Sequence, residues 1–470
     1  MMPRIFYRPQ RPDRAMASQD AGHETLFSRA WFALRGQIQR GGGADRSSRR
    51  PNAGRGKRVM AAFAAVAMIG AGLAGCSSGG RTKLVFAFNK REAVPFMQQV
   101  VDDYNKSQDK VNVVMDTSGL NSTAAGFVRG TPADLLLANF NNQAARYVNQ
   151  CAVTDLSDTD AAKRVRPDVK ALVDGVGKCP GRTSAVPYSI MAAGVIYNKD
   201  IFAKYNLQVP KTYDQLLSVS KTLKSNGVTP FFGTFYDGWT VSQGWFDYAA
   251  GGSLDLKSFF QSIEKDGANV GPNSSVSYEK DFLEPMNKMM TLAKDYTNTD
   301  ANSKIYGDGN TAMANGKAAM YLQGPWAFSE ISKTNPKANL GTFPLPMTDN
   351  PKDLKTAVNV DLGAMIPEQS KHQAEARDFM NYLFQPKIIN AYNASQLGFG
   401  PLKDSAPETD PRVAGLRSYY EKGKIYAGPS YVIPQAIPIP QLAQSIVLGA
   451  DPKDVLSTID ADWARFARRQ

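Results

Sequence analysis

Short apolar runs that do not alternate with polar residues separate helix-like stretches in the part of the chain after residue 80. Such runs occupy residues 84–88, 111–115 and 134–138, and an amphipathic stretch at residues 96–104 lies between the first two. Strands that are buried on both faces give continuous apolar runs, and helices between them provide the crossovers of a parallel sheet. The sequence therefore predicts an α/β fold built on a sheet that is covered on both faces.

A basic stretch at residues 55–58 precedes an Ala-, Gly- and Met-rich apolar run at residues 59–72, and Leu-Ala-Gly-Cys follows at 73–76. This order is typical of an export signal, and its last four residues resemble the lipobox of bacterial lipoproteins. We expect residues 1–75 to be removed and a lipid on Cys76 to hold the protein at the extracytoplasmic face of the bacterial cell membrane. A helix that stays in the membrane is the alternative, although the run is short for a span.

Most of the positive charge of the chain lies before Cys76. The net charge is +12, and residues 1–75 hold 13 Lys and Arg against 4 Asp and Glu, which leaves +3 for the other 395 residues. Such a nearly balanced charge gives no support to nucleic-acid binding. A length of 395 residues suits two lobes better than one. The Ser- and Gly-containing residues 76–81 are expected to form a flexible linker. The Arg-, Gly- and Ser-rich residues 1–54 are expected to be disordered or to reflect an upstream start codon.

Besides Cys76, the chain contains only Cys151 and Cys179. In an oxidising compartment, and without a His or a further Cys pair nearby, these two cysteines are expected to form a disulfide rather than a metal site. Two free thiols are the alternative. Closing this loop would stabilise the fold by roughly 3 kcal/mol in the chain-entropy model.

Two helix boundaries are legible in the sequence. Thr212 and Gln215 form a capping-box pattern at the start of one helix, and Gly227 is expected to end it. Asp451 and Pro452 have the pattern of a cap followed by proline at the first turn of the last helix. The apolar residues of that helix lie on one face, which predicts that it packs against the body of the protein.

Five segments, taken together and in order, resemble the maltose-binding-protein-like family of extracellular solute-binding proteins of bacterial carbohydrate ABC transporters. They are residues 186–200, 319–328 with its Gly-Pro-Trp, 358–367, 396–401 and 410–425. The resemblance spans essentially all of residues 82–470.

This resemblance implies a type II-like periplasmic-binding-protein fold, in which two α/β lobes are joined by a hinge and the ligand lies in the cleft between them. It implies a first lobe of residues 82–187 plus about 357–395, and a second of residues 188–356 plus about 396–470. It further implies a monomer without a cofactor or catalytic activity. Such a protein captures a carbohydrate, here expected to be a di- or oligosaccharide, and lobe closure signals its capture to the permease.

Sugar sites combine aromatic faces with polar side chains that bind hydroxyl groups. The resemblance places Trp326 against a sugar ring, Trp239 as a second platform, and Tyr431 in a region of aromatic contacts. Trp245 fits a core position as well as a site position, and a buried core position is also the alternative for Trp326.

The polar candidates follow the ends of predicted strands, where open α/β sheets bind ligands. Relatives often carry charged residues after the third of these strands, whereas this chain has Asn and Phe, which favours neutral hydrogen bonding and a stacking ring. Met191 stands near the hinge, where a relative carries Glu. Asp361 is expected to accept from a sugar hydroxyl or to form an ion pair in the hinge, and solvated surface is the alternative at the first strand end. The polar candidates and their aromatic neighbour are Asn89, Glu92, Asn139, Phe140, Asn141 and Asp361.

Three other functions are less compatible with the sequence. A secreted glycosidase needs two positioned carboxylates, and no spacing here indicates such a pair. A Ser-His-Asp hydrolase has only His372 available after Cys76. A binding protein of the same fold for ferric ion would use paired tyrosines such as Tyr419 and Tyr420, but their helical context predicts that one of them packs inward.

Overall fold

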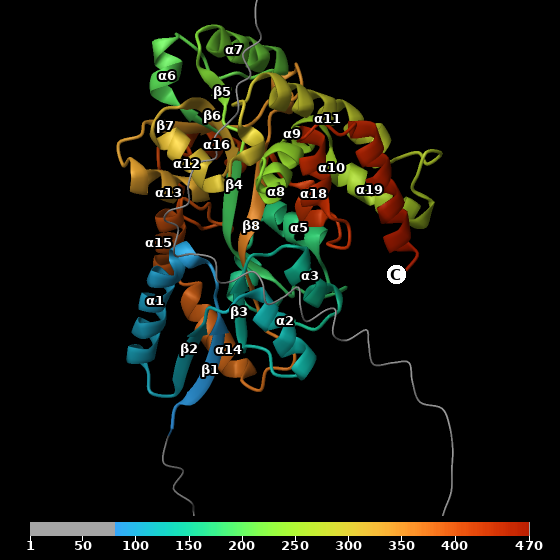
Figure 1. Ribbon diagram of the computed structural model, residues 1–470. Helices are drawn as coiled ribbons and strands as arrows, with labels where there is room; N and C mark the ends of the chain where they lie inside the picture. Colours follow the sequence, from blue (N-terminus) through green and yellow to red (C-terminus); the bar gives the residue numbers. More distant parts are fainter. Residues whose placement is uncertain (1–79, 470) are drawn as a thin grey trace, which may run out of the picture. The chain divides into compact units, whose positions relative to one another are not determined.

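The computed structural model describes residues 80–469, apart from the side chains of residues 120–122. Figure 1 shows how the helices and strands of this part are arranged. The expected leader at residues 1–75, the expected lipid attachment at Cys76 and residues 76–79 of the expected linker lie outside the described residues.

The strands form a nine-stranded sheet in the order β2-β1-β3-β8-β4-β6-β5, with β7 beside β4 and β9 beside β8. Strand β1 is parallel to β2 and β3, and β8 is antiparallel to β3 and β4. The strands are β1 Thr82–Ala87, β2 Val111–Asp116, β3 Leu135–Ala138, β4 Val186–Asn198, β5 Thr229–Phe231, β6 Ala318–Gln323, β7 Leu340–Phe343, β8 Thr356–Met365 and β9 Ile425–Ala427. The three apolar runs in the sequence correspond to β1, β2 and β3, so these predictions are confirmed.

Helices cover both faces of the sheet (Figure 1). Those before β4 are α1 Val94–Ser107, α2 Leu120–Arg129, α3 Asn142–Asn149, α4 Asp160–Arg164 and α5 Pro167–Val176. Those between β4 and β8 are α6 Lys199–Lys204, α7 Tyr213–Ser225, α8 Gly238–Thr240, the π-helical η2 Val241–Phe246, α9 Asp247–Ser253, α10 Leu256–Asp266, α11 Tyr278–Asp295, α12 Tyr306–Ala314 and α13 Trp326–Thr334. After β8 come α14 Gln373–Leu383, α15 Pro386–Gln396, α16 Ala414–Glu421, α17 Pro429–Val432, α18 Ile439–Val447 and α19 Pro452–Ala467. Short 3-10 turns occur at Arg91–Ala93, Gly267–Asn269, Ala301–Ser303 and Pro351–Asp353.

The buried apolar side chains form two clusters. One contains residues of β1, β2, β3, α1, α14 and α15, and it also takes in residues of α12, β6, α13 and β7 together with Leu397 and Leu416. The other contains residues of α7, α9, α10, α11, α18 and α19. Strands β4 and β8 contribute side chains to both clusters and run side by side from one to the other (Figure 1). Strands β6 and β7 also contribute side chains to both clusters, so the two cores meet along the strands that run between them.

The boundaries expected for two helices are confirmed. The Thr212 hydroxyl accepts from the Gln215 backbone N–H at the start of α7, and Gly227 follows that helix with a φ of 70°. Asp451 caps α19 by accepting from Lys453 N. Val455, Leu456, Ile459 and Trp463 of α19 are buried, so the last helix packs down as its apolar face predicts.

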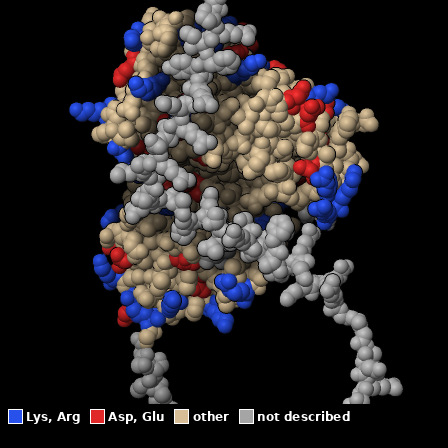
Figure 2. Space-filling model, viewed as in Figure 1, with Lys and Arg blue, Asp and Glu red and all other residues tan. Residues whose placement is uncertain are grey.

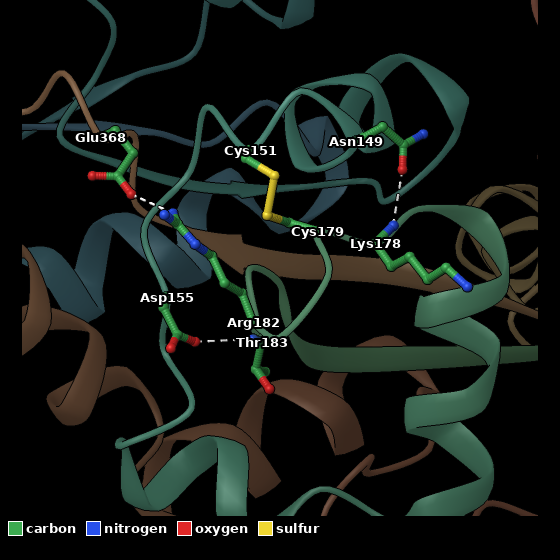
Figure 3. The surroundings of a disulfide bond; sticks show 8 residues. All are labelled: Asn149, Cys151, Asp155, Lys178, Cys179, Arg182, Thr183 and Glu368. Atoms are coloured by element: carbon green, nitrogen blue, oxygen red, sulfur yellow. Dashed lines mark hydrogen bonds and ion pairs between the residues drawn. A yellow bond between two sulfur atoms is a disulfide. The ribbon is translucent and has the colours of Figure 1, made fainter.

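Cys151 and Cys179 form the expected disulfide, with 5.3 Å between their Cα atoms. It joins the segment after α3 to the segment that leads into β4. Polar contacts surround it (Figure 3): Asn149 Oδ1 accepts from Lys178 N at 2.9 Å, and Arg182 pairs with Glu368 at 2.6 Å. The disulfide therefore holds the segment before β4 against the segment that follows α3.

Candidate functional site

A small pocket, open to solvent, lies where β4 and β8 pass between the two clusters. The face shown in Figure 2 is hollowed near its centre. The pocket is floored by the paired strands and walled by η2, α9, the start of α13 and the segment that leads into α17. Its lining residues are Ala193, Gln243, Asp247, Tyr248, Trp326, Ala357, Val358, Asn359, Gly428 and Tyr431.

One wall of this pocket is built by the helical stretch from α8 through η2 to α9. Gln243 and Asp247 are four residues apart, so they lie on one face of this stretch and both line the pocket. On another face, Gly244 packs against β6 so closely that a Cβ atom there would lie 2.3 Å from the Leu322 carbonyl oxygen. Single π-helical turns within helices frequently occur at functional sites.

Trp326 lines the pocket and is the first residue of α13. Its indole N–H donates to Gln323 Oε1 at 2.9 Å, and its ring packs against both apolar clusters while remaining partly exposed. The hydrogen bond holds the indole in one orientation. The predicted role of Trp326 as a projecting aromatic face is compatible with this position.

Two tyrosines and an amide complete the polar lining. The Tyr248 hydroxyl is buried and has no hydrogen-bond partner among the described residues. Burial raises the pKa of Tyr431, and a side-chain hydrogen bond with Asn359 opposes that rise. A buried hydroxyl without a partner costs free energy, and a ligand that supplies a partner recovers it. Tyr248, Tyr431 and Asn359 therefore give the pocket polar groups that can form hydrogen bonds.

Asp247 is 2% exposed and accepts from Ser430 through both of its carboxylate oxygens. Oδ1 lies 2.8 Å from Ser430 N, and Oδ2 lies 2.5 Å from Ser430 Oγ. Burial raises the pKa of Asp247 to about 7, and the two hydrogen bonds from Ser430 oppose this rise. The neighbouring Gly428 leaves room for the carboxylate, since a Cβ atom there would lie 2.1 Å from Oδ2.

On the side of the first cluster, an ion pair follows β1. Lys90 Nζ lies 2.5 Å from Asp361 Oδ2 and 3.8 Å from Glu92 Oε1. The Asn139 side-chain amide donates to the Asp361 backbone oxygen at 3.4 Å. Asp361 thus has the ion-pair role that was one of its two expected roles, and Lys90 is its partner. Met191 is buried in β4 directly opposite Asn359 of β8, at the hinge position expected for it.

Two of the aromatic candidates, Trp245 and Phe140, are buried and are not accessible to a ligand. Trp245 is 2% exposed and packs between Phe231 and Phe235, with ring centroids 5.9 and 5.3 Å away, so it has the core position that was its alternative. Phe140 is 1% exposed within the first cluster and cannot offer a ring face to a sugar. The expectation of a stacking ring after β3 is therefore wrong.

The other candidates remain partly accessible. Trp239 is 36% exposed and its ring lies 5.0 Å from that of Tyr306. Asn141 caps α3, because its side-chain oxygen accepts from Gln143 N and Ala144 N. Asn89 is half-buried after β1. Neither Asn89 nor Asn141 lines the pocket at the strand pair.

Sequence reasoning missed four polar residues of the pocket, Gln243, Asp247, Tyr248 and Asn359. Two signals were available. Gln243 and Asp247 follow Trp239 at intervals of four residues, which places them on the same helical face. Asn359 and Asp361 alternate along one strand, so they lie on the same face of β8.

Of the two tyrosines that a ferric-ion site would use, Tyr419 is partly exposed and Tyr420 is buried. Tyr420 packs into the first cluster and donates to the Gly400 oxygen at 2.9 Å, so one tyrosine of the pair does turn inward, as the helical context predicts. Within residues 80–469 no three His, Cys, Asp or Glu side chains are grouped so that they could hold a metal ion. Across the same described range, no helix has both the length and the apolar character needed to span a bilayer.

Comparisons with known proteins agree with this architecture. The model of the family "bacterial extracellular solute-binding protein" matches residues 89–388. The multiple sugar-binding protein of Streptococcus mutans is 29% identical over 210 residues, which are 44% of this chain and 49% of that protein. The chain thus spans about half the length of that relative. The melibiose/raffinose/stachyose-binding protein MelE of Bacillus subtilis is 22% identical over 276 residues, 58% of this chain and 62% of that protein.

Solved structures show the same fold. The apo form of RafE from Streptococcus pneumoniae has a TM-score of 0.69 at 20% identity, covering 82% of this chain and 98% of that chain. RafE in complex with raffinose has the same TM-score and identity, covering 82% and 100%. The two-lobe α/β fold is therefore confirmed. With the family model matching most of its length, the chain belongs to the bacterial extracellular solute-binding proteins, which act outside the cytoplasm.

Proposed function

We propose that this protein is the sugar-capturing component of an ABC importer, which holds a di- or oligosaccharide between its lobes and delivers it unaltered to the permease. The observation that carries the proposal is the pocket at the strand pair. It combines the partly exposed Trp326 ring with amide side chains and with the hydroxyl of Tyr248, which has no hydrogen-bond partner within residues 80–469. Aromatic faces suit the C–H face of a pyranose, and amides and hydroxyls suit its hydroxyl groups.

The names of the relatives guide the choice of sugar. One is called a multiple sugar-binding protein, another a melibiose/raffinose/stachyose-binding protein, and RafE was solved with raffinose. A structural neighbour from Bacillus licheniformis was solved with stachyose. Melibiose, raffinose and stachyose therefore form a series of increasing length with which to probe this chain.

We assign roles within the cleft as follows. Trp326 provides the stacking face, and Trp239, beside Tyr306, is a second platform toward the rim. At the pocket, Gln243 of the second lobe and Asn359 of β8 meet hydroxyl groups. On the first lobe, the groups that meet hydroxyls as the lobes close are Asn89, Glu92, Asn139 and the Lys90–Asp361 pair.

The lipid on Cys76 is proposed to keep the protein, as a monomer, at the extracytoplasmic face of the membrane, where the permease can receive the sugar. Neither a cofactor nor turnover is part of this role. Sugar recovered from the complex should therefore be chemically unchanged, and conversion to shorter sugars would replace the proposed role with that of a glycosidase.

Replacing Trp326 tests the function. Trp326→Ala should weaken affinity for the best-binding sugar of the series by about tenfold or more, because it removes the stacking face. Isothermal calorimetry on the wild type and the variant measures this change. Unchanged affinity would exclude Trp326 from the site.

The matched control is Trp463→Phe, which alters a tryptophan buried in the second cluster. This variant should lower the melting temperature and leave the affinity unchanged. If none of the three sugars binds the wild type, the same series is repeated with other di- and oligosaccharides, and failure of all of them contradicts the proposal.

A further inference from the structure

Residues 428–433 form a short segment, which we call the strap, that links the pocket to both lobes. The strap directly follows β9, which pairs with β8 of the hinge from Thr356 to Val358. Tyr431, within the strap, lines the pocket. The Ile433 carbonyl oxygen, at the end of the strap, accepts from the Asn142 side-chain amide at the start of α3, in the first lobe.

The strap is anchored to the second lobe at Ser430. Both the N–H and the hydroxyl of Ser430 donate to Asp247, at 2.8 and 2.5 Å. The carboxylate is 2% exposed, and the absence of a side chain at Gly428 allows it to lie against the strap. Two charge-assisted hydrogen bonds to adjacent atoms of one residue fix its position more strictly than one bond would.

We propose that Asp247 is a positioning residue of the sugar pocket: by holding Ser430 it places the strap so that the Tyr431 ring forms the pocket wall. The proposal rests on the proposed function for its ligand, a neutral sugar. Asp247 acts here through Ser430 and Tyr431.

The position of the strap should depend on the ionisation of Asp247. An ionised carboxylate offers two acceptor oxygens to Ser430, whereas a protonated one keeps only one oxygen free of the proton. Burial raises the pKa of Asp247 to about 7, so the change falls within the range in which the protein can be studied.

The groups that face Asp247 do not titrate in the same range. They are Tyr248 on α9, Tyr426 on β9 and Tyr431 on the strap, and burial raises the pKa of each above the ordinary tyrosine range. Lys355 also lies beside this group of tyrosines: its ammonium lies over the Tyr426 ring and donates to the Leu254 oxygen, and burial lowers its pKa. A transition near pH 7 in the signal from this pocket therefore reports the ionisation of Asp247.

The first experiment needs no sugar. The fluorescence of Trp326, which shares the pocket with Tyr431, is obtained by subtracting the spectrum of Trp326→Phe, and is followed from pH 5.5 to 8.5. We expect a transition near pH 7 that Asp247→Asn abolishes. Ser430→Ala should reduce the transition, and Ser430→Thr, which keeps the hydroxyl, should restore it. A transition that is unchanged in Ser430→Ala would show that Trp326 senses the charge of Asp247 rather than the strap, and would overturn the proposal.

The second experiment measures affinity for raffinose and stachyose by calorimetry between pH 6 and 8.5. Wild-type affinity should rise several-fold with pH, and Asp247→Asn should bind about tenfold more weakly than the wild type at pH 8.5, with a flat pH profile. If Asp247→Asn has the same sugar affinity and the same pH dependence as the wild type, the proposal is overturned. If the wild type binds neither sugar, that result bears on the proposed function, and the fluorescence experiment still decides the role of Asp247.

The matched control is Asp460→Asn. Asp460 is also a buried carboxylate that accepts two N–H groups, from Tyr278 at 2.7 Å and Glu279 at 3.1 Å, and burial also raises its pKa. It caps α11 and does not line the pocket. Asp460→Asn should therefore lower stability while leaving the fluorescence transition and the sugar affinity as in the wild type.

Discussion

At the scale of single residues, side chains that line the pocket are next in sequence to side chains that pack in the core. Asn359 lines the pocket and Val360 beside it packs into the first cluster. Gln243 faces the pocket, whereas Trp245, two residues on, is in the core. Such divergence follows from strand alternation and from the turn of a helix. A substitution of a pocket residue can therefore affect binding without affecting stability, and a substitution of its neighbour in the core can do the reverse.

The buried Asp247 should make stability depend on pH. The folded-state pKa of about 7 lies above the unfolded value of 3.8, so folding favours the protonated form. This contribution to stability is fully present below about pH 4 and is lost as the pH rises through 7. With 1.36 kcal/mol for each pKa unit, the loss is on the order of 4 kcal/mol.

Urea unfolding between pH 4 and 8 measures this effect, and Asp247→Asn should flatten the corresponding slope. Asp155→Asn is the control: hydrogen bonds from Thr183 and Ser157 lower the pKa of Asp155, so its contribution is lost only as the pH falls below about 4. The same slope in the wild type and in Asp247→Asn would contradict the prediction.

The residues of the site could be predicted only in part. Trp326 was accessible to sequence reasoning because Gly-Pro before it resembles a family signature. Trp245 and Phe140 were not distinguishable from site residues, since an aromatic side chain in a loop-like context gives no sign of which face it turns to the core. Asp247 and Ser430 are 183 positions apart, and no local pattern indicates that they meet.

At the scale of secondary-structure elements, helix ends were predicted correctly where the capping interactions involve residues that are close in sequence. The cap at Thr212, the left-handed Gly227 and the cap at Asp451 each involve atoms within a few residues. The π-helical turn at Val241–Phe246 was not predicted, because it depends on how Gly244 packs against β6. The order of the strands around β8 likewise depends on pairing across the whole chain.

The disulfide should contribute substantially to stability. It closes a segment with a sequence separation of 28, and the chain-entropy model gives about 3–4 kcal/mol for a loop of this length. Cys151→Ser should lower the free energy of unfolding in urea by this amount, and dithiothreitol should lower that of the wild type equally.

The double variant Cys151→Ser/Cys179→Ser serves as the control, because it should be insensitive to dithiothreitol. Mass spectrometry of the unreduced protein should show the two cysteine peptides linked. If both thiols of the native protein are freely alkylated, the disulfide is rejected.

At the scale of the whole molecule, the two clusters share β4 and β8, and the pocket sits on that shared pair. Under the proposed function, a sugar bound there stabilises the closed arrangement if it makes more contacts in that arrangement than in the open one. The fold could be predicted from the sequence because the apolar runs and the ordered family segments extend over nearly the whole chain.

The attachment of the molecule to the membrane is also testable. Cys76→Ser should abolish labelling by radioactive palmitate and release the protein from the membrane fraction or leave it uncleaved, because the thiol is the proposed site of lipidation. Cys151→Ser, which changes a different cysteine, should keep the label. Normal membrane retention of Cys76→Ser would contradict the anchor.

The pairing of β3 with β8 has a consequence for the timing of folding. Leu136 pairs with Met365, so the sheet of the first lobe lacks its central partner until about 230 further residues have been synthesised. At 5–20 residues per second this takes about 10–50 s, during which the N-terminal strands cannot complete their lobe. A chain truncated after Asp353 should therefore be cleaved by protease within residues 82–138, and protection of that region would contradict this order. Late folding of the first lobe suits a protein that crosses a membrane before it folds, because the export machinery then binds the chain while its first lobe is still unfolded.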